Sequence, residues 1–327
     1  MKRRKAASMK EEFSVIGFGC WAVSGAGVWN KSNDIDSIKA IQKALDLGVN
    51  FFDVAPVYGF GHAEEVLGKA LKGNRQKVLI ASKCGLVWDS QYRIKNQLTA
   101  ESIYKEIDDS LRRLNTDYID IYQIHWPDPN TPIEETMEAL INIKKAGKIR
   151  NIGVSNFPVE LTKKAMEMDT IVSQQCLYNM LERNEKSYHS IPLEYRTEKE
   201  ILPFCRENGQ AFFPYSPLCQ GLLTGTFKET DNFDEKDVRA NNPKFKGEIF
   251  IAYLQTVEKL KEIAKSIGKP LNQLAINWLV KNDVITSVIC GAQNIEHVEE
   301  NVASIEWELS DDTIREIDKL LDNYKND

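Results

Sequence analysis

The fold is decided by the stretch that begins Tyr118-Ile-Asp-Ile-Tyr-Gln-Ile-His125 and ends Ile149-Arg-Asn-Ile-Gly-Val-Ser155. Both ends are apolar runs rich in isoleucine, which is typical of strands covered on both faces. Between them, Thr131-Pro132 places a proline at the first position of a predicted helix, and Gly147 ends it. The stretch therefore predicts a strand, a helix and a second strand parallel to the first.

The same unit repeats along the chain. Strand-like runs cover residues 13–19, 49–53, 77–83, 118–125, 149–155, 171–176, 210–215 and 284–291, and helical patterns lie between them. Eight such units close naturally into a barrel. We therefore expect the α/β class and a (β/α)8 TIM barrel, in a single domain over residues 13–327.

An open, doubly wound sheet is the main alternative to the barrel. That fold carries G-x-G-x-x-G after its first strand, whereas Gly17-Phe-Gly19 lacks the third glycine. A long connection over residues 216–247 has little periodicity and many polar residues. In a barrel it follows strand seven, on the face where active sites are built.

Composition and charge exclude several classes of protein. The chain has 327 residues, 42% of them hydrophobic and 28% charged, with a net charge of −6. This composition is that of a globular domain, and the acidic balance argues against a nucleic-acid-binding protein. No apolar stretch is long enough to span a membrane, so we expect no membrane partner.

The cysteines and the N-terminus indicate a cytoplasmic protein. Six single cysteines with no zinc-like spacing to a histidine are typical of a reducing compartment and indicate no metal site. Residues 1–12 are basic but lack the apolar core of a signal peptide, because Glu11 and Glu12 interrupt them. We expect these residues to form a mobile basic arm.

Polar side chains lie at the carboxyl ends of the predicted strands. In a barrel of parallel strands these ends all lie at the same opening, which we call the mouth. The polar residues are Asp53, Lys83, His125, Ser155, Asn156 and Gln175, and Tyr58 follows Asp53 by five residues. Taken singly, Asp53 could be a turn residue, Lys83 a solvated strand end, and Tyr58 or His125 structural. Together they predict a functional constellation.

Six motifs in order resemble the aldo-keto reductase family, most closely its bacterial general-stress and broad-range aldehyde reductases. They are Asp53-Val-Ala-Pro-Val-Tyr58-Gly, Ala81-Ser-Lys83, Gln123-Ile-His125-Trp-Pro, Gly147-Lys-Ile-Arg-Asn-Ile-Gly-Val-Ser155-Asn156, Ser216-Pro-Leu-Cys-Gln-Gly-Leu-Leu-Thr-Gly225 and Gly291-Ala-Gln-Asn-Ile-Glu-His-Val-Glu-Glu300-Asn301. They cover nearly the whole chain. The resemblance implies reduction of aldehydes, and of some ketones, to alcohols without a metal.

The resemblance also assigns four catalytic residues. Tyr58 would donate the proton, His125 would orient the substrate oxygen, and Asp53 would hold Lys83. A tyrosine is a slow acid near neutral pH, so we expect the ammonium group of Lys83 to lower the pKa of Tyr58.

The resemblance places NADPH across the same mouth. Ser155, Asn156 and Gln175 would contact the nicotinamide amide, Tyr215 its ring, and Ser216, Leu218 and Gly221 the pyrophosphate. Arg239 would contact a phosphate, or else be a solvated loop residue. The adenosine end would lie on Gly291, Gln293, His297, Glu300 and Asn301, where no arginine is present, so use of NADH stays open.

Trp21, Trp88 and Trp126 are candidate walls of a substrate pocket, although packing is the commoner role of a buried tryptophan. The predicted partner is a small carbonyl substrate. The sequence leaves the oligomeric state open, and a monomer is compatible with it. A nucleotide-sensing regulatory module on the same fold, with little turnover, is the alternative function.

Overall fold

The computed structural model describes residues 1–25, 33–235 and 237–324. Within this part of the chain, eight parallel strands form one sheet in chain order. They are β3 (Ile16–Gly19), β4 (Phe51–Asp53), β5 (Leu79–Cys84), β8 (Ile119–Ile124), β9 (Ile149–Ser155), β10 (Ile171–Leu177), β13 (Ala211–Tyr215) and β14 (Val288–Gly291). A parallel bridge between Phe212 and Ile285 joins the sheet's two ends. The predicted (β/α)8 barrel is confirmed.

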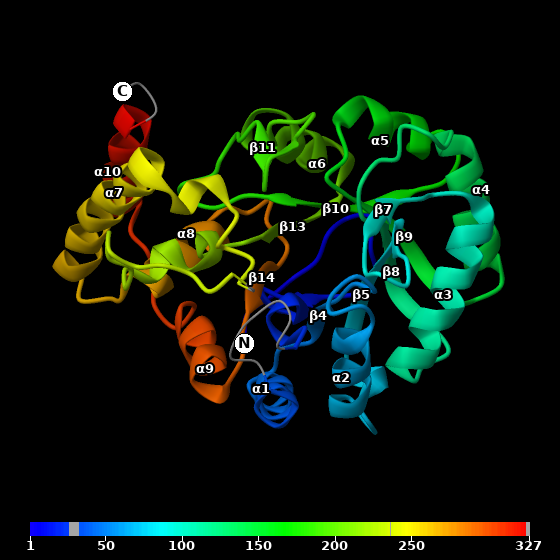
Figure 1. The fold of residues 1–327 in the computed structure, drawn as a ribbon. Coiled ribbons are helices and arrows are strands. Elements are labelled where there is room, and N and C mark those ends of the chain that lie inside the picture. Colours follow the sequence, from blue (N-terminus) through cyan, green and yellow to red (C-terminus); the bar gives the residue numbers. More distant parts are fainter. Residues whose placement is uncertain (26–32, 236, 325–327) are drawn as a thin grey trace.

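Helices pack around these strands (Figure 1). They are α1 (Asp34–Asp46), α2 (His62–Ala70), α3 (Ala100–Leu114), α4 (Ile133–Lys145), α5 (Val159–Met166), α6 (Leu202–Asn208), α7 (Gly247–Ser266), α8 (Leu271–Lys281), α9 (Ile295–Ala303) and α10 (Asp311–Tyr324). The helix α4 is present where the sequence predicts it, but it begins at Ile133, so Pro132 is its N-cap and not its first residue.

Short elements complete the chain. Two hairpins follow barrel strands: β6 (Leu86–Trp88) with β7 (Ile94–Asn96), and β11 (Ser187–Tyr188) with β12 (Ile191–Pro192). Helical turns are η1 (Cys20–Val23), η2 (Arg75–Lys77), η3 (Thr197–Ile201), η4 (Cys219–Thr224) and η5 (Pro243–Phe245). The expected long loop after the seventh barrel strand is present, and η4 and η5 lie within it.

The interior of the barrel is a packed core. The rings of Phe13, Phe51 and Phe213 lie 4.5–5.3 Å apart between centroids. Ala6 and Met9, from the N-terminal segment, are buried against the same core. The barrel is therefore filled by side chains, and a site for ligands is expected at the ends of the strands.

Residues 1–12 do not form the mobile arm that we expected. β1 (Arg3–Arg4) pairs with β2 (Phe13–Ser14), so the segment folds back as a hairpin. The guanidinium group of Arg4 donates to the carbonyl oxygens of Asn282 (2.8 Å) and Ile285 (2.6 Å), and also to that of Val280. Arg4 therefore fastens the N-terminal segment to the residues that precede the last barrel strand.

We expect Arg4→Met to lower the free energy of unfolding by about 2 kcal/mol, because a charged donor is lost and carbonyl groups are left without it. Urea unfolding measures the change. Arg3→Met is the matched control, since Arg3 is exposed in the same strand, and it should change stability by less than about 0.5 kcal/mol. Equal small effects of both substitutions would contradict the anchoring role.

Candidate active site

The four predicted catalytic side chains converge at the carboxyl ends of the strands. Asp53 ends β4, Lys83 lies in β5, His125 follows β8, and Tyr58 lies in the turn before α2. The Nζ atom of Lys83 lies 2.7 Å from Asp53 Oδ1 and 3.2 Å from the Tyr58 hydroxyl oxygen. The rings of Tyr58 and His125 meet edge to face with centroids 5.9 Å apart. The geometry therefore brings together a phenol, an ammonium group, a carboxylate and an imidazole.

Burial governs the electrostatics of this group. Lys83 is 0% exposed and Asp53 is 3% exposed, so their ion pair is removed from water. Desolvation lowers the pKa of Lys83, and the neighbouring Asp53 opposes that shift.

The expected lowering of the tyrosine pKa is wrong in direction. Burial raises the pKa of Tyr58 well above 10, and the negative charge of Asp53 adds to the shift. The ammonium group of Lys83 does not reverse it, because Asp53 already compensates that charge at 2.7 Å. Tyr58 therefore keeps its proton. Since its oxygen accepts from Lys83, its own O–H can donate to another group.

His125 is neutral near pH 7. Burial lowers its pKa well below 6.5, and the charge of Lys83 lowers it further. A neutral imidazole retains one N–H donor, which is what the orientation of a carbonyl oxygen requires.

The predicted nicotinamide contacts surround the same four residues. Asn156 accepts hydrogen bonds on Oδ1 from the hydroxyl groups of Tyr215 and Tyr195, each at 2.9 Å. Its Nδ2 atom donates to Ser155 Oγ at 3.1 Å. Gln175 donates from Nε2 to Asp53 Oδ1 at 2.8 Å, which links it directly to the candidate catalytic carboxylate. These side chains are thus held in fixed positions at the barrel mouth.

The loop after β13 has an unusual backbone. Ser216, Cys219 and Gln220 have positive φ angles, and Gly221 has φ +99°. A Cβ atom on Gly221 would lie 3.3 Å from the Phe227 ring, so glycine suits the position. Within the turn, the backbone N–H groups of Cys219 and Gly221 donate to the carbonyl oxygens of Ser216 and Leu218. Left-handed turns of this kind are a common setting for anion binding by backbone N–H groups.

Arg239 is partnered within this loop. It donates to both carboxylate oxygens of Asp237, at 2.8 and 2.6 Å, and it lies 4.6 Å from the Phe233 ring centroid. A Cβ atom on Gly221 would lie 3.7 Å from its Nη1 atom. Its place beside Gly221 agrees better with the phosphate alternative than with a solvated side chain.

The predicted adenosine segment forms the turn from β14 into α9. Asn301 donates to the carbonyl oxygen of Gly291 at 3.2 Å, and the backbone N–H of Gln293 faces His297 Nδ1 at 3.5 Å. Glu300 accepts from Asn272 at 2.9 Å. Gly291 therefore ends β14, Gln293 lies in the connecting loop, and His297, Glu300 and Asn301 lie on α9. Their contact with a cofactor stays a prediction.

The three tryptophans differ in position. Trp21 lies beside the catalytic tyrosine, with ring centroids 6.4 Å apart. Trp88 lies on the β6–β7 hairpin against Phe60, at 5.6 Å. Trp126 packs against the same hydrophobic cluster as Tyr215. The structure thus brings Trp21 closest to the reacting groups by ring contact, and leaves Trp88 in a separate aromatic group.

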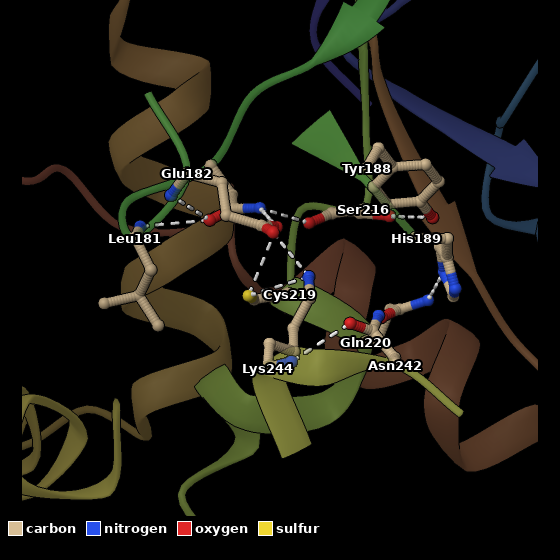
Figure 2. A network of polar contacts seen from close by, with 10 residues as sticks. Leu181, Glu182, Tyr188, His189, Ser216, Cys219, Gln220, Asn242 and Lys244 are labelled. Carbon is tan, nitrogen blue, oxygen red and sulfur yellow. Dashed lines mark hydrogen bonds and ion pairs between the residues drawn. The ribbon is translucent and has the colours of Figure 1, made fainter. Parts of the chain in front are cut away.

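The sequence analysis missed residues on the β11–β12 hairpin and beside it. Tyr188 and His189 contact the loop after β13, and the buried ion pair of Glu182 and Lys244 lies to one side of them (Figure 2). Strands of two residues give no periodic signal, and no motif identified these side chains.

In the described part of the chain, no group of three or more His, Cys, Asp or Glu residues could hold a metal ion. No helix among these residues has the length and apolarity needed to cross a membrane. A surface hollow lined by Arg3, Asp46 and Lys77 lies at the opposite, amino end of the strands and belongs to no part of the site. All six cysteines lie within the described residues, and each is a free, buried thiol.

Comparison with known proteins agrees with this geometry. Residues 15–322 match the model of the aldo/keto reductase family. Aldo-keto reductase YhdN of Bacillus subtilis (strain 168) is 37% identical, over 97% of this chain and 92% of the relative. The NADH-specific methylglyoxal reductase of Escherichia coli (strain K12) is 35% identical, over 95% of each chain.

A solved structure is also similar. The glycerol dehydrogenase AKR11B4 from Gluconobacter oxydans has a TM-score of 0.86 and 32% identity, over 98% of this chain and 95% of that one. None of these three names describes a regulatory module, so the nucleotide-sensing alternative gains no support. The chain belongs to the aldo/keto reductase family.

Proposed function

We propose that this protein reduces aldehydes to alcohols with a nicotinamide dinucleotide, and that Tyr58 is the proton donor. The observation that carries the proposal is the convergence of Lys83 with Asp53 (2.7 Å) and Tyr58 (3.2 Å) at a mouth that His125 also borders. A metal is not part of the proposed mechanism.

The residues at the mouth fit a dinucleotide. Amide and hydroxyl groups at the ends of β9 and β10 suit a carboxamide, and the left-handed turns at residues 216–221 suit a pyrophosphate. When bound, the nicotinamide supplies a hydride to the carbonyl carbon. His125 donates a hydrogen bond to the carbonyl oxygen and orients it toward Tyr58. As negative charge develops on that oxygen, the Tyr58 hydroxyl gives it a proton, and Lys83 stabilises the phenolate that remains.

Steady-state assays with an aldehyde panel and both dinucleotides test this proposal. Repeated turnover of NADPH or NADH in stoichiometry with alcohol supports it. Oxidation of only one equivalent of cofactor per protein would contradict it and would favour a binding role.

NADPH is the proposed cofactor, with NADH also accepted. Gln293 and His297 offer hydrogen bonds to a 2′-phosphate but no permanent positive charge. One similar protein is named as NADH-specific, which supports the proposal that NADH is accepted as well as NADPH.

We propose a cytoplasmic location, because six free thiols suit a reducing compartment. A small carbonyl compound is the partner, and a monomer would suffice for this chemistry.

We expect His297→Arg to raise the preference for NADPH over NADH about tenfold, because a charged donor binds phosphate more strongly than a neutral one. The measurement is kcat/KM for each cofactor at a fixed aldehyde concentration. His297→Gln is the neutral control and should leave the ratio within about twofold. If the arginine variant has the same ratio of kcat/KM for NADPH to kcat/KM for NADH as the wild type, the 2′-phosphate does not contact residue 297.

A further inference from the structure

The tip of the β11–β12 hairpin has a strained backbone. Tyr188 pairs with Ile191, and His189 and Ser190 between them have φ angles of +50° and +65°. Asparagine or glycine usually occupies such a two-residue turn, because a larger side chain there costs energy. Strain of this kind is retained mostly where a side chain has a task. The side chain in question is the imidazole of His189.

Ring contacts connect His189 to the catalytic group. Its ring centroid lies 6.4 Å from that of Trp21, and Trp21 lies 6.4 Å from Tyr58. On the other side, the ring of Tyr188 lies 4.5 Å from His189 and 5.3 Å from Tyr215. The imidazole is therefore part of a continuous row of rings that borders the reacting phenol.

The hydrogen bonds of the hairpin tip identify which nitrogen carries the proton. Asn242 donates to Gln220 Oε1 at 2.8 Å, so the amide nitrogen of Gln220 faces His189. That nitrogen lies 2.6 Å from His189 Nε2 (Figure 2). Since an amide nitrogen only donates, His189 Nε2 accepts, and the proton of the neutral ring lies on Nδ1.

The ring is neutral in solution near pH 7. Burial lowers the pKa of His189 to about 4, and the positive charge of Lys244 contributes to the shift. The Nδ1–H group is then the ring's single N–H donor. No side chain or backbone acceptor for it is present among residues 1–25, 33–235 and 237–324.

A buried network holds the tip in place. Glu182 bonds with Lys244 and lies 3.3 Å from the thiol of Cys219, directly before Gln220 (Figure 2). The hydroxyl of Tyr188 lies 3.3 Å from Ser216 Oγ. These contacts fix the hairpin on the loop after β13, so the position of the Nδ1–H donor is defined before a substrate arrives.

We infer that His189 is a substrate-binding residue whose Nδ1–H donates to a second oxygen of the substrate, beyond the reacting carbonyl. The inference rests on the proposed function. It specifies the substrate class as aldehydes that carry a hydroxyl or carbonyl oxygen a few bonds from the reacting group.

Matched pairs of aldehydes, in which a methyl replaces a hydroxyl, test the inference. The pairs are 2-hydroxypropanal with 2-methylpropanal, 3-hydroxybutanal with 3-methylbutanal, and 4-(hydroxymethyl)benzaldehyde with 4-ethylbenzaldehyde. Because one neutral hydrogen bond changes kcat/KM by about twofold to tenfold, the wild type should prefer the hydroxyl member of at least one pair by that factor. His189→Ala should abolish that preference while reduction of the methyl member stays within about twofold.

His189→Asn is the conservative control. Its amide nitrogen replaces Nδ1, and asparagine tolerates a positive φ, so the preference should return. Unchanged cofactor affinity in both variants, measured by fluorescence quenching, shows that the loop after β13 is intact. A wild type without any hydroxyl preference, or an alanine variant that keeps it, would overturn the inference while the proposed function stands. Failure of the wild type to reduce any of the six aldehydes would contradict the proposed function itself.

Discussion

Replacement of Tyr58 by phenylalanine is expected to lower kcat by about 100-fold to 10,000-fold, the usual contribution of a positioned general acid. The ring contacts with Trp21 and His125 need no hydroxyl, so folding and cofactor affinity should stay close to wild type. Stopped-flow turnover and cofactor titration measure the two quantities. Wild-type turnover in this variant would remove Tyr58 from the role of proton donor.

The pH dependence gives a second readout for the same residue. Because burial raises the pKa of Tyr58 well above 10, the phenol stays protonated, and the rate of aldehyde reduction should be flat between about pH 6 and pH 9. Alcohol oxidation needs the phenolate and should therefore rise about tenfold per pH unit over the same range. A reduction rate that falls tenfold per unit above pH 7 would show that the pKa of Tyr58 is lowered instead.

Replacement of Lys83 by methionine should lower the free energy of unfolding by about 3–5 kcal/mol, because it leaves the carboxylate of Asp53 buried without its partner. Turnover should fall at least about 100-fold, since the donor to the Tyr58 oxygen is lost. Urea unfolding and steady-state kinetics measure these effects separately.

The double variant Lys83→Met with Asp53→Asn separates structure from catalysis. It carries no buried charge at this position, so we expect at least half of the lost stability to return. Turnover should stay low, because neither substitution restores an ammonium group beside Tyr58. Recovery of turnover together with stability would mean that Lys83 acts only on folding.

The barrel could be predicted from the sequence because its strands are covered on both faces. Runs such as residues 118–125 and 149–155 are then rich in isoleucine, and they stand out from the helices between them.

The N-terminal segment was not predictable, because its anchor is a distant acceptor. The guanidinium group of Arg4 binds carbonyl oxygens some 280 residues away. A run of basic residues by itself predicts a solvent-exposed segment, so nothing in the sequence indicates these contacts. The hairpin that carries His189 was missed for a related reason. Its strands are too short for periodicity, and its left-handed turn contains no glycine.

The convergence of the four candidate side chains was predictable because a barrel brings strand ends together whatever their spacing in sequence. Asp53, Lys83 and His125 follow that rule, and Tyr58 lies in the turn between the end of β4 and the start of α2. The direction of the pKa shift on Tyr58 was not predictable. It depends on how completely Asp53 compensates Lys83 and on how deeply the phenol is buried, and only coordinates give these quantities.

The anchoring of Arg4 also bears on how the chain reaches its native state. Its acceptor Ile285 is the residue whose bridge to Phe212 closes the barrel, so the seam is secured by groups 281 positions apart. A nascent polypeptide cannot make these contacts until almost all of it has left the ribosome. Closure should therefore be a late, slow event in folding, because contacts between distant positions carry the largest entropic barrier.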